Sequence, residues 1–194
     1  MDKKSVIEFF NRLAPQWDSD MIRSDEIINI ILDNAMIGES QDVLDVACGT
    51  GVLIPDYLAR KVSSVTGIDI SPEMVEIAKK KFPEENVRII CADVEETDPG
   101  MLFDRIVVYN ALPHFPEPER LVSRLSELLK SGGVLTVAHG MSAEKINNHH
   151  SGTASAVSMR LLDAEELAMI FSKHLKVMTV ISDDRMYQVA GMKV

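Results

Sequence analysis

The stretch that most constrains the fold is residues 42–51, where an apolar run leads into a turn that contains glycines. The run is typical of a central parallel strand covered on both faces, and consists of Val43, Leu44, Val46 and Ala47. Gly49 and Gly51 follow, and an apolar pattern with helical spacing begins at Val52. Such a turn directs the unpaired N–H groups of the helix at whatever lies above the end of the strand. Because glycine has no Cβ, the turn predicts a site where a ligand approaches the backbone closely.

Asp45 interrupts this apolar run from inside the predicted strand. A buried carboxylate without a partner is costly. We therefore expect Asp45 to accept hydrogen bonds from loop amides or water, or to face a cationic group of a ligand.

The chain has 194 residues, enough for one α/β domain and too few for two. Its net charge of −10 argues against a nucleic-acid partner, which normally requires a basic patch. There is no apolar run long enough to span a membrane, and the N-terminus leads into an amphipathic pattern and not a signal segment. Cys48 and Cys91 lie in apolar, strand-like surroundings. Buried, reduced thiols are predicted, which favours a cytoplasmic protein.

Strands and helices alternate along most of the chain. Strands are predicted over 42–47, 64–70, 87–91, 103–109, 134–138, 175–181 and 185–194. Helix starts are marked by a Ser5–Glu8 capping box, by Ser24, by Ser71 before Pro72, and by an Asp163–Glu166 capping box. The order predicts an α/β, doubly wound and mostly parallel seven-stranded sheet that ends in an antiparallel hairpin.

One domain over 1–194 is expected. It comprises N-terminal cap helices (1–40), a ligand-binding core (41–140), a lid loop (141–162), and a C-terminal helix and hairpin (163–194). The lid is expected because residues 141–162 have weak periodicity and many small or polar side chains.

Polar residues follow each of the first four strands, at the edge of the sheet where ligands bind in this architecture. Asp69 lies 18 residues beyond Gly51, a spacing at which an acid can accept hydrogen bonds from both ribose hydroxyls of a nucleoside. Asp93 follows the third strand and Asn110 the fourth. Asp93 lies further out, where it could accept a hydrogen bond from an adenine amino group.

These motifs together resemble the class I S-adenosylmethionine-dependent methyltransferases of the small ubiquinone-biosynthesis-like group, also called methyltransferase type 11. The resemblance covers residues 5–140, and its motifs occur in order and with the right spacing. They are the first motif (43–51), the ribose motif (67–71), the adenine motif (91–94), the fourth motif (103–115), the turn before the fifth strand (128–133), and an N-terminal segment that folds over the cofactor (10–18). The resemblance implies a Rossmann-like fold and S-adenosylmethionine as the cofactor.

The resemblance also implies a role for each matching residue. Asp45, Ala47 and Gly49 would surround the methionine end of the cofactor, and Asp69 would hold the ribose. The full implied site is Trp17, Asp45, Ala47, Cys48, Gly49, Gly51, Asp69, Ile70, Met74, Ala92, Asp93, Val94, Asn110 and Ala111. For Trp17 two roles stay open, because it could face the sulfonium or only pack the N-terminal helices.

The predicted function is methyl transfer to a small-molecule acceptor by direct displacement at the sulfonium methyl. The alternative is a non-catalytic S-adenosylmethionine-binding protein with a regulatory or interaction role. A nicotinamide site is disfavoured because Ile54 occupies the position of the third glycine, and no lysine follows the glycines as a P-loop requires.

Histidines supply the remaining candidates. His114 follows the fourth strand and is the tentative catalytic base, with packing on the substrate as its alternative. His139 ends the fifth predicted strand, on the ligand edge, and His149 and His150 lie in the loop that follows, which is expected to fold back as a polar lid over the substrate. They are weaker candidates for metal ligands, because their spacing fits no fixed ligand pattern, so no metal site is predicted. The identity of the acceptor and the oligomeric state cannot be read from the sequence.

Overall fold

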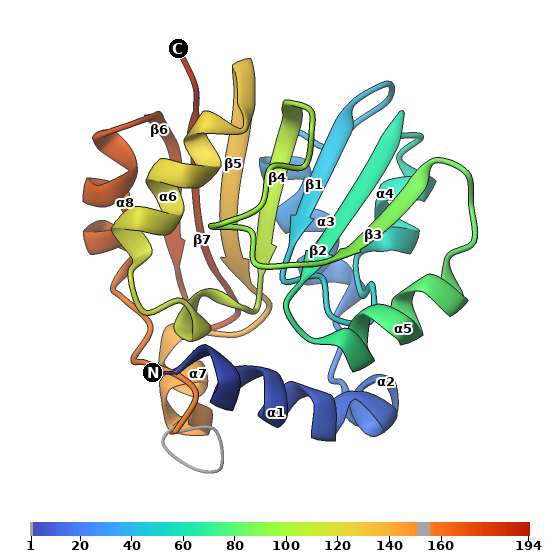
Figure 1. The fold of residues 1–194 in the computed structure, drawn as a ribbon. Coiled ribbons are helices and arrows are strands. Elements are labelled where there is room, and N and C mark those ends of the chain that lie inside the picture. The colour runs from blue at the N-terminus through green and yellow to red at the C-terminus, as the bar shows by residue number, and fades with distance from the viewer. Residues whose placement is uncertain (1, 151–155) are drawn as a thin grey trace.

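The structure of the chain is a computed structural model that describes residues 2–150 and 156–194, without the side chains of residues 149 and 150. Its centre is a seven-stranded sheet of order β3-β2-β1-β4-β5-β7-β6, as Figure 1 shows. The strands are β1 (Asp42–Val46), β2 (Ser64–Asp69), β3 (Val87–Cys91), β4 (Phe103–Tyr109), β5 (Leu129–His139), β6 (Lys176–Ser182) and β7 (Tyr187–Met192). Strands β1 to β5 pair in parallel, and β7 runs antiparallel between β5 and β6. The predicted fold, including its C-terminal hairpin, is confirmed.

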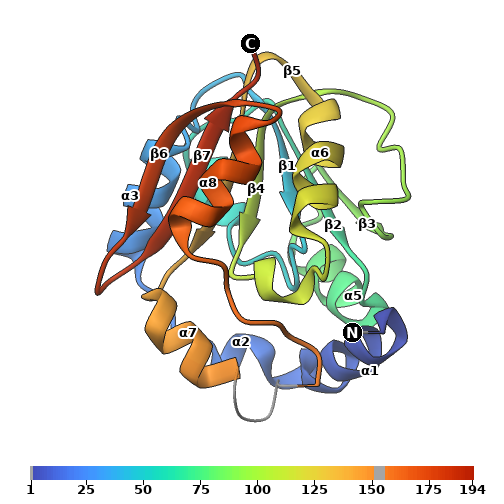
Figure 2. The same cartoon turned by 90° about the vertical axis from the view of Figure 1, so that its left-hand side faces the viewer.

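Helices cover both faces of this sheet (Figure 2). One face packs against α3 (Asp25–Asn34), α4 (Ile54–Ala59) and α5 (Pro72–Lys81), whose apolar side chains share a core with β1 and β2. The other packs against α6 (Pro118–Glu127) and α8 (Ala164–Ser172). None of the helices in the described part of the chain is long and apolar enough to cross a membrane.

The capping predictions succeed at three helices and fail at one. The Ser24 and Ser71 hydroxyls accept from the backbone N–H groups of Ile27 and Met74, and Asp163 and Glu166 form the predicted capping box. The Ser5–Glu8 capping box is wrong. Helix α1 (Lys3–Leu13) begins earlier, because the Asp2 carboxylate accepts the Ser5 N–H at 3.2 Å.

Residues 141–162 were expected to form a loop, but they contain helix α7 (Ala143–His150). The Ser142 hydroxyl accepts the Lys145 N–H at 3.4 Å, and Ile146 is buried against the main core. Among residues 143–148 of this helix only Ile146 is fully buried, which explains why its apolar periodicity is weak.

Two further expectations are corrected. Residues 131–133 lie within β5 rather than in a turn before it, since Gly132 N–H donates to the Lys193 carbonyl at 2.8 Å. Cys91 is exposed, while Cys48 is buried as expected. Cys91 ends β3, an edge strand, and residues 92–102 that follow form no helix to cover it. Both thiols are free, as predicted.

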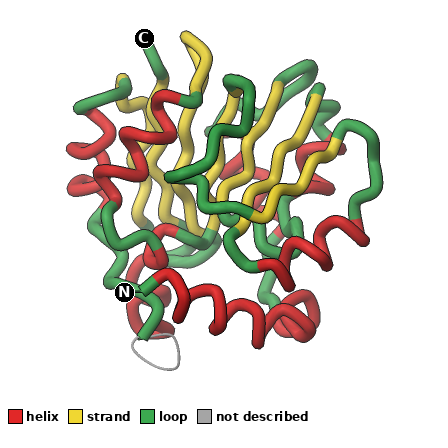
Figure 3. Tube along the Cα trace, in the orientation of Figure 1, coloured by secondary structure: helices red, strands yellow, loops and turns green. Residues whose placement is uncertain are grey.

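The N-terminal segment lies across the carboxyl ends of the strands, at the lower edge of the sheet in Figures 1 and 3. It consists of α1, a 3-10 turn η1 (Ala14–Gln16) and the short helix α2 (Trp17–Asp20). A second 3-10 turn, η2 (Leu112–His114), follows β4 at the same edge. These pieces enclose the space above the strand ends.

Candidate active site

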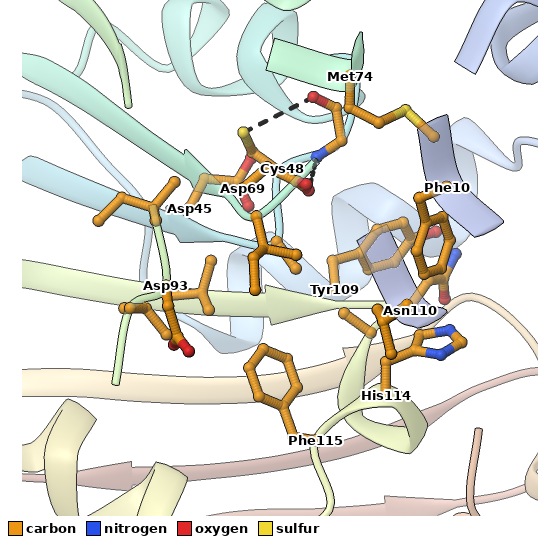
Figure 4. A pocket seen from close by; sticks show the side chains of 18 of the residues that line it. Phe10, Asp45, Cys48, Asp69, Met74, Asp93, Tyr109, Asn110, His114 and Phe115 are labelled. Atoms are coloured by element: carbon orange, nitrogen blue, oxygen red, sulfur yellow. Dashed lines mark hydrogen bonds between the residues drawn. The ribbon is translucent and has the colours of Figure 1, made fainter. Parts of the chain in front are cut away.

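A cavity of about 180 Å³ lies between the carboxyl ends of β1 to β4 and helix α1. Its floor comes from the strand ends, including Asp45, Asp69 and Asp93, and its roof from α1, including Lys3 and Phe10. Figure 4 shows the aromatic rings and the acids of this cavity pointing toward one another from different elements. The predicted convergence of the strand ends is therefore present in the structure.

The turn after β1 is built for a close approach to the backbone. Ala47 and Gly49 have φ values of +54° and +56°, and a residue other than glycine, such as Ala47, adopts that conformation only at a cost of about 1–2 kcal/mol. Gly49 N–H donates to Asp69 Oδ2 at 2.8 Å (Figure 4), and Ser71 N–H donates to Asp69 Oδ1 at 2.8 Å. One carboxylate thus joins the loops that follow β1 and β2.

Asp45 is only 2% exposed, and its carboxylate accepts no hydrogen bond from the described residues. The loop amides that were expected to reach it bind Asp69 instead. Burial, with a smaller contribution from the charge of Asp69, raises the pKa of Asp45 to about 8. A buried carboxylate that lines a cavity without a partner favours a ligand with a cationic or hydrogen-bond-donating group.

Comparison with known proteins identifies the fold of this region. Residues 43–133 match the model of a family described as a methyltransferase domain. This segment runs from β1 through β4 to the start of β5 and so includes the floor of the cavity. Residues 43–133 are therefore similar to a methyltransferase domain.

Curated relatives of this chain have names that give different methyl acceptors. A malonyl-[acyl-carrier protein] O-methyltransferase of Acetivibrio thermocellus is 34% identical over 138 residues, which are 70% of this chain and 49% of that protein. A ubiquinone biosynthesis O-methyltransferase of Coxiella burnetii is 29% identical over 143 residues, 70% of this chain and 61% of that protein. The chain therefore spans about half to three fifths of the length of these relatives.

Solved structures share the fold at low sequence identity. The N-methyltransferase NodS from Bradyrhizobium japonicum, in complex with S-adenosyl-L-homocysteine, superposes with a TM-score of 0.72 at 15% identity, over 100% of this chain and 99% of that one. The [4+2]-cyclase SpnF superposes with a TM-score of 0.73 at 20% identity, over 92% and 75% of the two chains. Two different activities on one fold mean that this likeness supports the architecture alone.

Most of the residues predicted from the sequence line this cavity. They are Trp17, Asp45, Ala47, Cys48, Gly49, Asp69, Ile70, Met74, Ala92, Asp93, Val94, Asn110, Ala111 and His114. Trp17 lines the cavity and also packs edge-on against Phe10, with ring centroids 5.7 Å apart, so its role toward the sulfonium stays a prediction. Burial raises the pKa of Cys48 well above its usual value, which keeps that thiol protonated.

Two predicted residues lie elsewhere. Gly51 does not line the cavity but packs under Phe82, whose Cε2 would be 2.5 Å from a Cβ added to Gly51. His139 is 2% exposed and faces Tyr187 of β7, with ring centroids 5.8 Å apart, away from the cavity. The side chains of His149 and His150 lie outside the described residues. Among the described residues there is no cluster of metal-ligating side chains.

His114 enters the cavity from η2 with one ring nitrogen fixed. Its Nδ1 lies 2.8 Å from the carbonyl oxygen of Val157, and because a carbonyl can only accept, Nδ1 carries the proton. The Phe10 ring meets the imidazole edge-on at a centroid distance of 4.9 Å. Burial lowers the pKa of His114 from 6.5, against the opposing effect of the Val157 carbonyl. In this tautomer Nε2 is the nitrogen that can accept a proton.

Asn110 shows the left-handed backbone conformation often found at functional turns, with φ of +54°. Its side-chain oxygen accepts the Gly140 N–H at 3.0 Å, and its own N–H donates to the Ala138 carbonyl at 2.9 Å. These bonds hold the C-terminal end of β4 beside the C-terminal end of β5. They thereby orient the residues that follow β4 toward the cavity.

The sequence analysis named no individual role for twelve lining residues, although Phe10, Val46, Ile68, Tyr109 and Phe115 lie within its motifs; the others are Lys3, Val6, Met21, Val52, Leu53, Glu95 and Pro116. Most follow directly from neighbours that it did identify, since Glu95 is next to Val94 and Phe115 next to His114. Val6 and Phe10 are on the apolar face of α1, which gave a usable signal. Lys3 gave none, because an N-terminal lysine on an amphipathic helix usually lies in solvent.

Proposed function

We propose that the chain transfers a methyl group from S-adenosylmethionine to a small-molecule acceptor. The observation that carries the proposal is the Asp45 carboxylate, buried in the cavity wall without a partner among the described residues. The cofactor has an ammonium and a sulfonium group, and either one would compensate a buried negative charge. The residues present therefore fit this cofactor.

The other two acids support a nucleoside ligand. Asp69 and Asp93 follow adjacent strands and both line the cavity. We propose that Asp69 accepts hydrogen bonds from the ribose and Asp93 from the adenine amino group, with Ile70 and Met74 against the ring. The remaining proposed contacts to the cofactor are Trp17, Ala47, Cys48, Gly49, Ala92, Val94, Asn110 and Ala111.

The cofactor supplies an activated methyl group on a sulfonium, so the protein needs to align an acceptor and exclude water. Helix α1 supports water exclusion because it closes over the cavity through Val6 and Phe10. His114 is proposed as the base for an acceptor that is protonated at the working pH. Its fixed tautomer and its lowered pKa leave Nε2 unprotonated near neutral pH.

The competing function is a cofactor-binding protein without methyl transfer. This alternative has a regulatory or interaction role and no catalysis, and the family match and the two O-methyltransferase relatives favour transfer over it. The names of these relatives give different acceptors, one of them a malonyl group on an acyl-carrier protein, so they support methyl transfer without naming the acceptor of this chain.

Two measurements test the proposal. Isothermal titration calorimetry with S-adenosylhomocysteine tests the site, and the Asp45→Ala and Asp93→Ala variants should weaken binding by about tenfold or more if the acids contact the ligand. Incubation with S-adenosylmethionine and a panel of small acceptors tests the reaction by formation of S-adenosylhomocysteine. Tight binding without turnover over a broad panel would favour the non-catalytic alternative. Absence of binding would reject the proposal.

The cellular location of the protein and the class of its partner are also proposed here. An exposed free thiol at Cys91 supports a reducing compartment, and we propose the cytoplasm. The net charge of −10 supports a partner other than nucleic acid.

A further inference from the structure

Helix α1 is fastened to the rest of the domain at both ends. At its N-terminal end Lys3 Nζ pairs with Asp93 and, at 2.6 Å, with Glu96 Oε1. Near its C-terminal end Asn11 Oδ1 accepts the Ser71 hydroxyl at 2.7 Å. The helix is therefore a roof held by polar contacts on the β2 and β3 sides of the cavity, as its position in Figure 1 indicates.

The ion pair of Lys3 is unusual because its partner, the Asp93 carboxylate, also lines the cavity. Both oxygens of Asp93 are engaged, Oδ1 by the Glu95 N–H at 2.9 Å and Oδ2 by the Lys3 ammonium. The Asp93 side chain is 16% exposed, and both Asp93 and Lys3 line the cavity. The same carboxylate is the proposed acceptor for the adenine amino group, so a ligand meets Lys3 at that position.

We propose that the Lys3 ammonium competes with the adenine amino group of the ligand for the Asp93 carboxylate. The Lys3–Asp93 ion pair, here called the latch, thereby couples opening of the α1 roof to ligand binding. The inference rests on the proposed function, because it takes the ligand to be an adenine nucleoside. When the amino group binds Asp93, Lys3 gives up that carboxylate and keeps Glu96, which is on the outer side with 63% of its side chain exposed. The exchange replaces an ion pair with a ligand contact, so the latch lowers both affinity and association rate.

The chain offers a matched control one residue away. Lys4 is on the same helix with 81% of its side chain exposed, pairs with Glu8 at 3.8 Å, and is not among the residues that line the cavity. Lys3→Met keeps an unbranched apolar stem but removes the ammonium, and Lys4→Met makes the same change in charge away from the site. Folding of both variants is checked by thermal unfolding.

The experiment measures S-adenosylhomocysteine binding by calorimetry, and association by stopped-flow fluorescence of Trp17, the only tryptophan. We expect Lys3→Met to tighten binding by about twofold to fivefold, the effect of one partly exposed ion pair, and to speed association. Lys4→Met should match the unmodified chain. Without ligand, amide hydrogen exchange of residues 3–13 should be faster in Lys3→Met than in Lys4→Met.

A second ligand makes the test specific to the adenine amino group. An S-adenosylhomocysteine analogue with hydrogen in place of that amino group does not need the Asp93 oxygen held by Lys3, so it should bind Lys3→Met and the unmodified chain equally. Unchanged or weaker S-adenosylhomocysteine binding in Lys3→Met, or an equal gain for the analogue, would overturn the latch and leave the proposed function intact. No binding of S-adenosylhomocysteine to the unmodified chain would overturn both.

Discussion

The Asp69 carboxylate accepts the backbone N–H of Gly49 at 2.8 Å and, through its other oxygen, the N–H of Ser71 at 2.8 Å. Asp69 therefore fixes the backbone of two loops in addition to lining the cavity. A charged acceptor between two amides makes strong hydrogen bonds, each worth about 1.5–3 kcal/mol. The position of the glycine turn depends on this residue.

Asp69→Asn should weaken both the fold and the site. The asparagine keeps the shape but turns an NH₂ group toward one of the two amide donors, so one strong bond is lost. We expect the free energy of unfolding to fall by about 1.5–3 kcal/mol and S-adenosylhomocysteine affinity to fall by about tenfold or more. Urea unfolding and calorimetry measure the two quantities. Asp98→Asn is the control, since the Asp98 carboxylate accepts the Gly100 N–H at 2.9 Å in an exposed turn.

Asp45 should make stability without ligand fall as the pH rises. Its pKa is raised from 3.8 to about 8 in the folded protein, so between those values the native state holds a proton that the unfolded state has lost. The stabilising effect of that proton is complete below about pH 4 and disappears as the pH rises through about 8. Asp45→Asn removes this dependence, so its melting temperature relative to the unmodified chain should increase between about pH 6 and about pH 9.

The expected gain at high pH is at least about 1 kcal/mol, or about 2–4 °C in melting temperature for a chain of this size. Asp20→Asn, at an exposed position of α2, should give no such trend. The same residue predicts proton release when S-adenosylhomocysteine binds near neutral pH, which calorimetry in buffers of different ionisation enthalpy detects. A melting-temperature difference independent of pH would contradict the assignment to Asp45.

Alanine substitutions at Gly51 and Gly100 distinguish the energetic cost of packing an added Cβ from the cost of a positive φ. Both have positive φ, +85° and +82°, so alanine at either position costs about 1–2 kcal/mol in backbone energy. At Gly51 the new Cβ would also lie 2.5 Å from the Phe82 ring and 2.9 Å from Ile54, whereas Gly100 has nothing within 4 Å. Gly51→Ala should thus be less stable than Gly100→Ala by about 1–3 kcal/mol in urea unfolding. Equal losses in the two variants would show that Phe82 yields without cost.

The positions of the strands and most of the cavity floor were predictable because they depend on local patterns. Apolar runs that end in Gly49 and Asp69 identify buried strands, and parallel strands bring their carboxyl ends to one edge whatever the details of packing. The caps at Ser24 and Ser71 are likewise local. These features need only the residues on either side of them.

What could not be predicted depends on contacts between distant parts of the chain. The Lys3–Asp93 pair joins residues far apart in the sequence, and a lysine side chain carries no periodic signal. His139 was expected on the ligand edge, but β7 pairs with β5 in a register that places His139 opposite Tyr187 and turns it into the core. Nothing within residues 134–139 specifies that register.

His114 gives the last prediction, because its tautomer and its pKa act in the same direction. A base works in its unprotonated form, and a pKa below the usual 6.5 keeps His114 unprotonated as the pH falls through that value. With an acceptor that requires deprotonation, we expect the rate to stay level through about pH 6.5 and to fall only at lower pH. His114→Asn should lower kcat by about 10²-fold or more and remove that acid limb, while S-adenosylhomocysteine affinity changes little. His174→Asn, on the surface after α8, controls for loss of an imidazole. If His114→Asn keeps the rate and the acid limb of the unmodified chain, His114 only packs against the acceptor and Phe10.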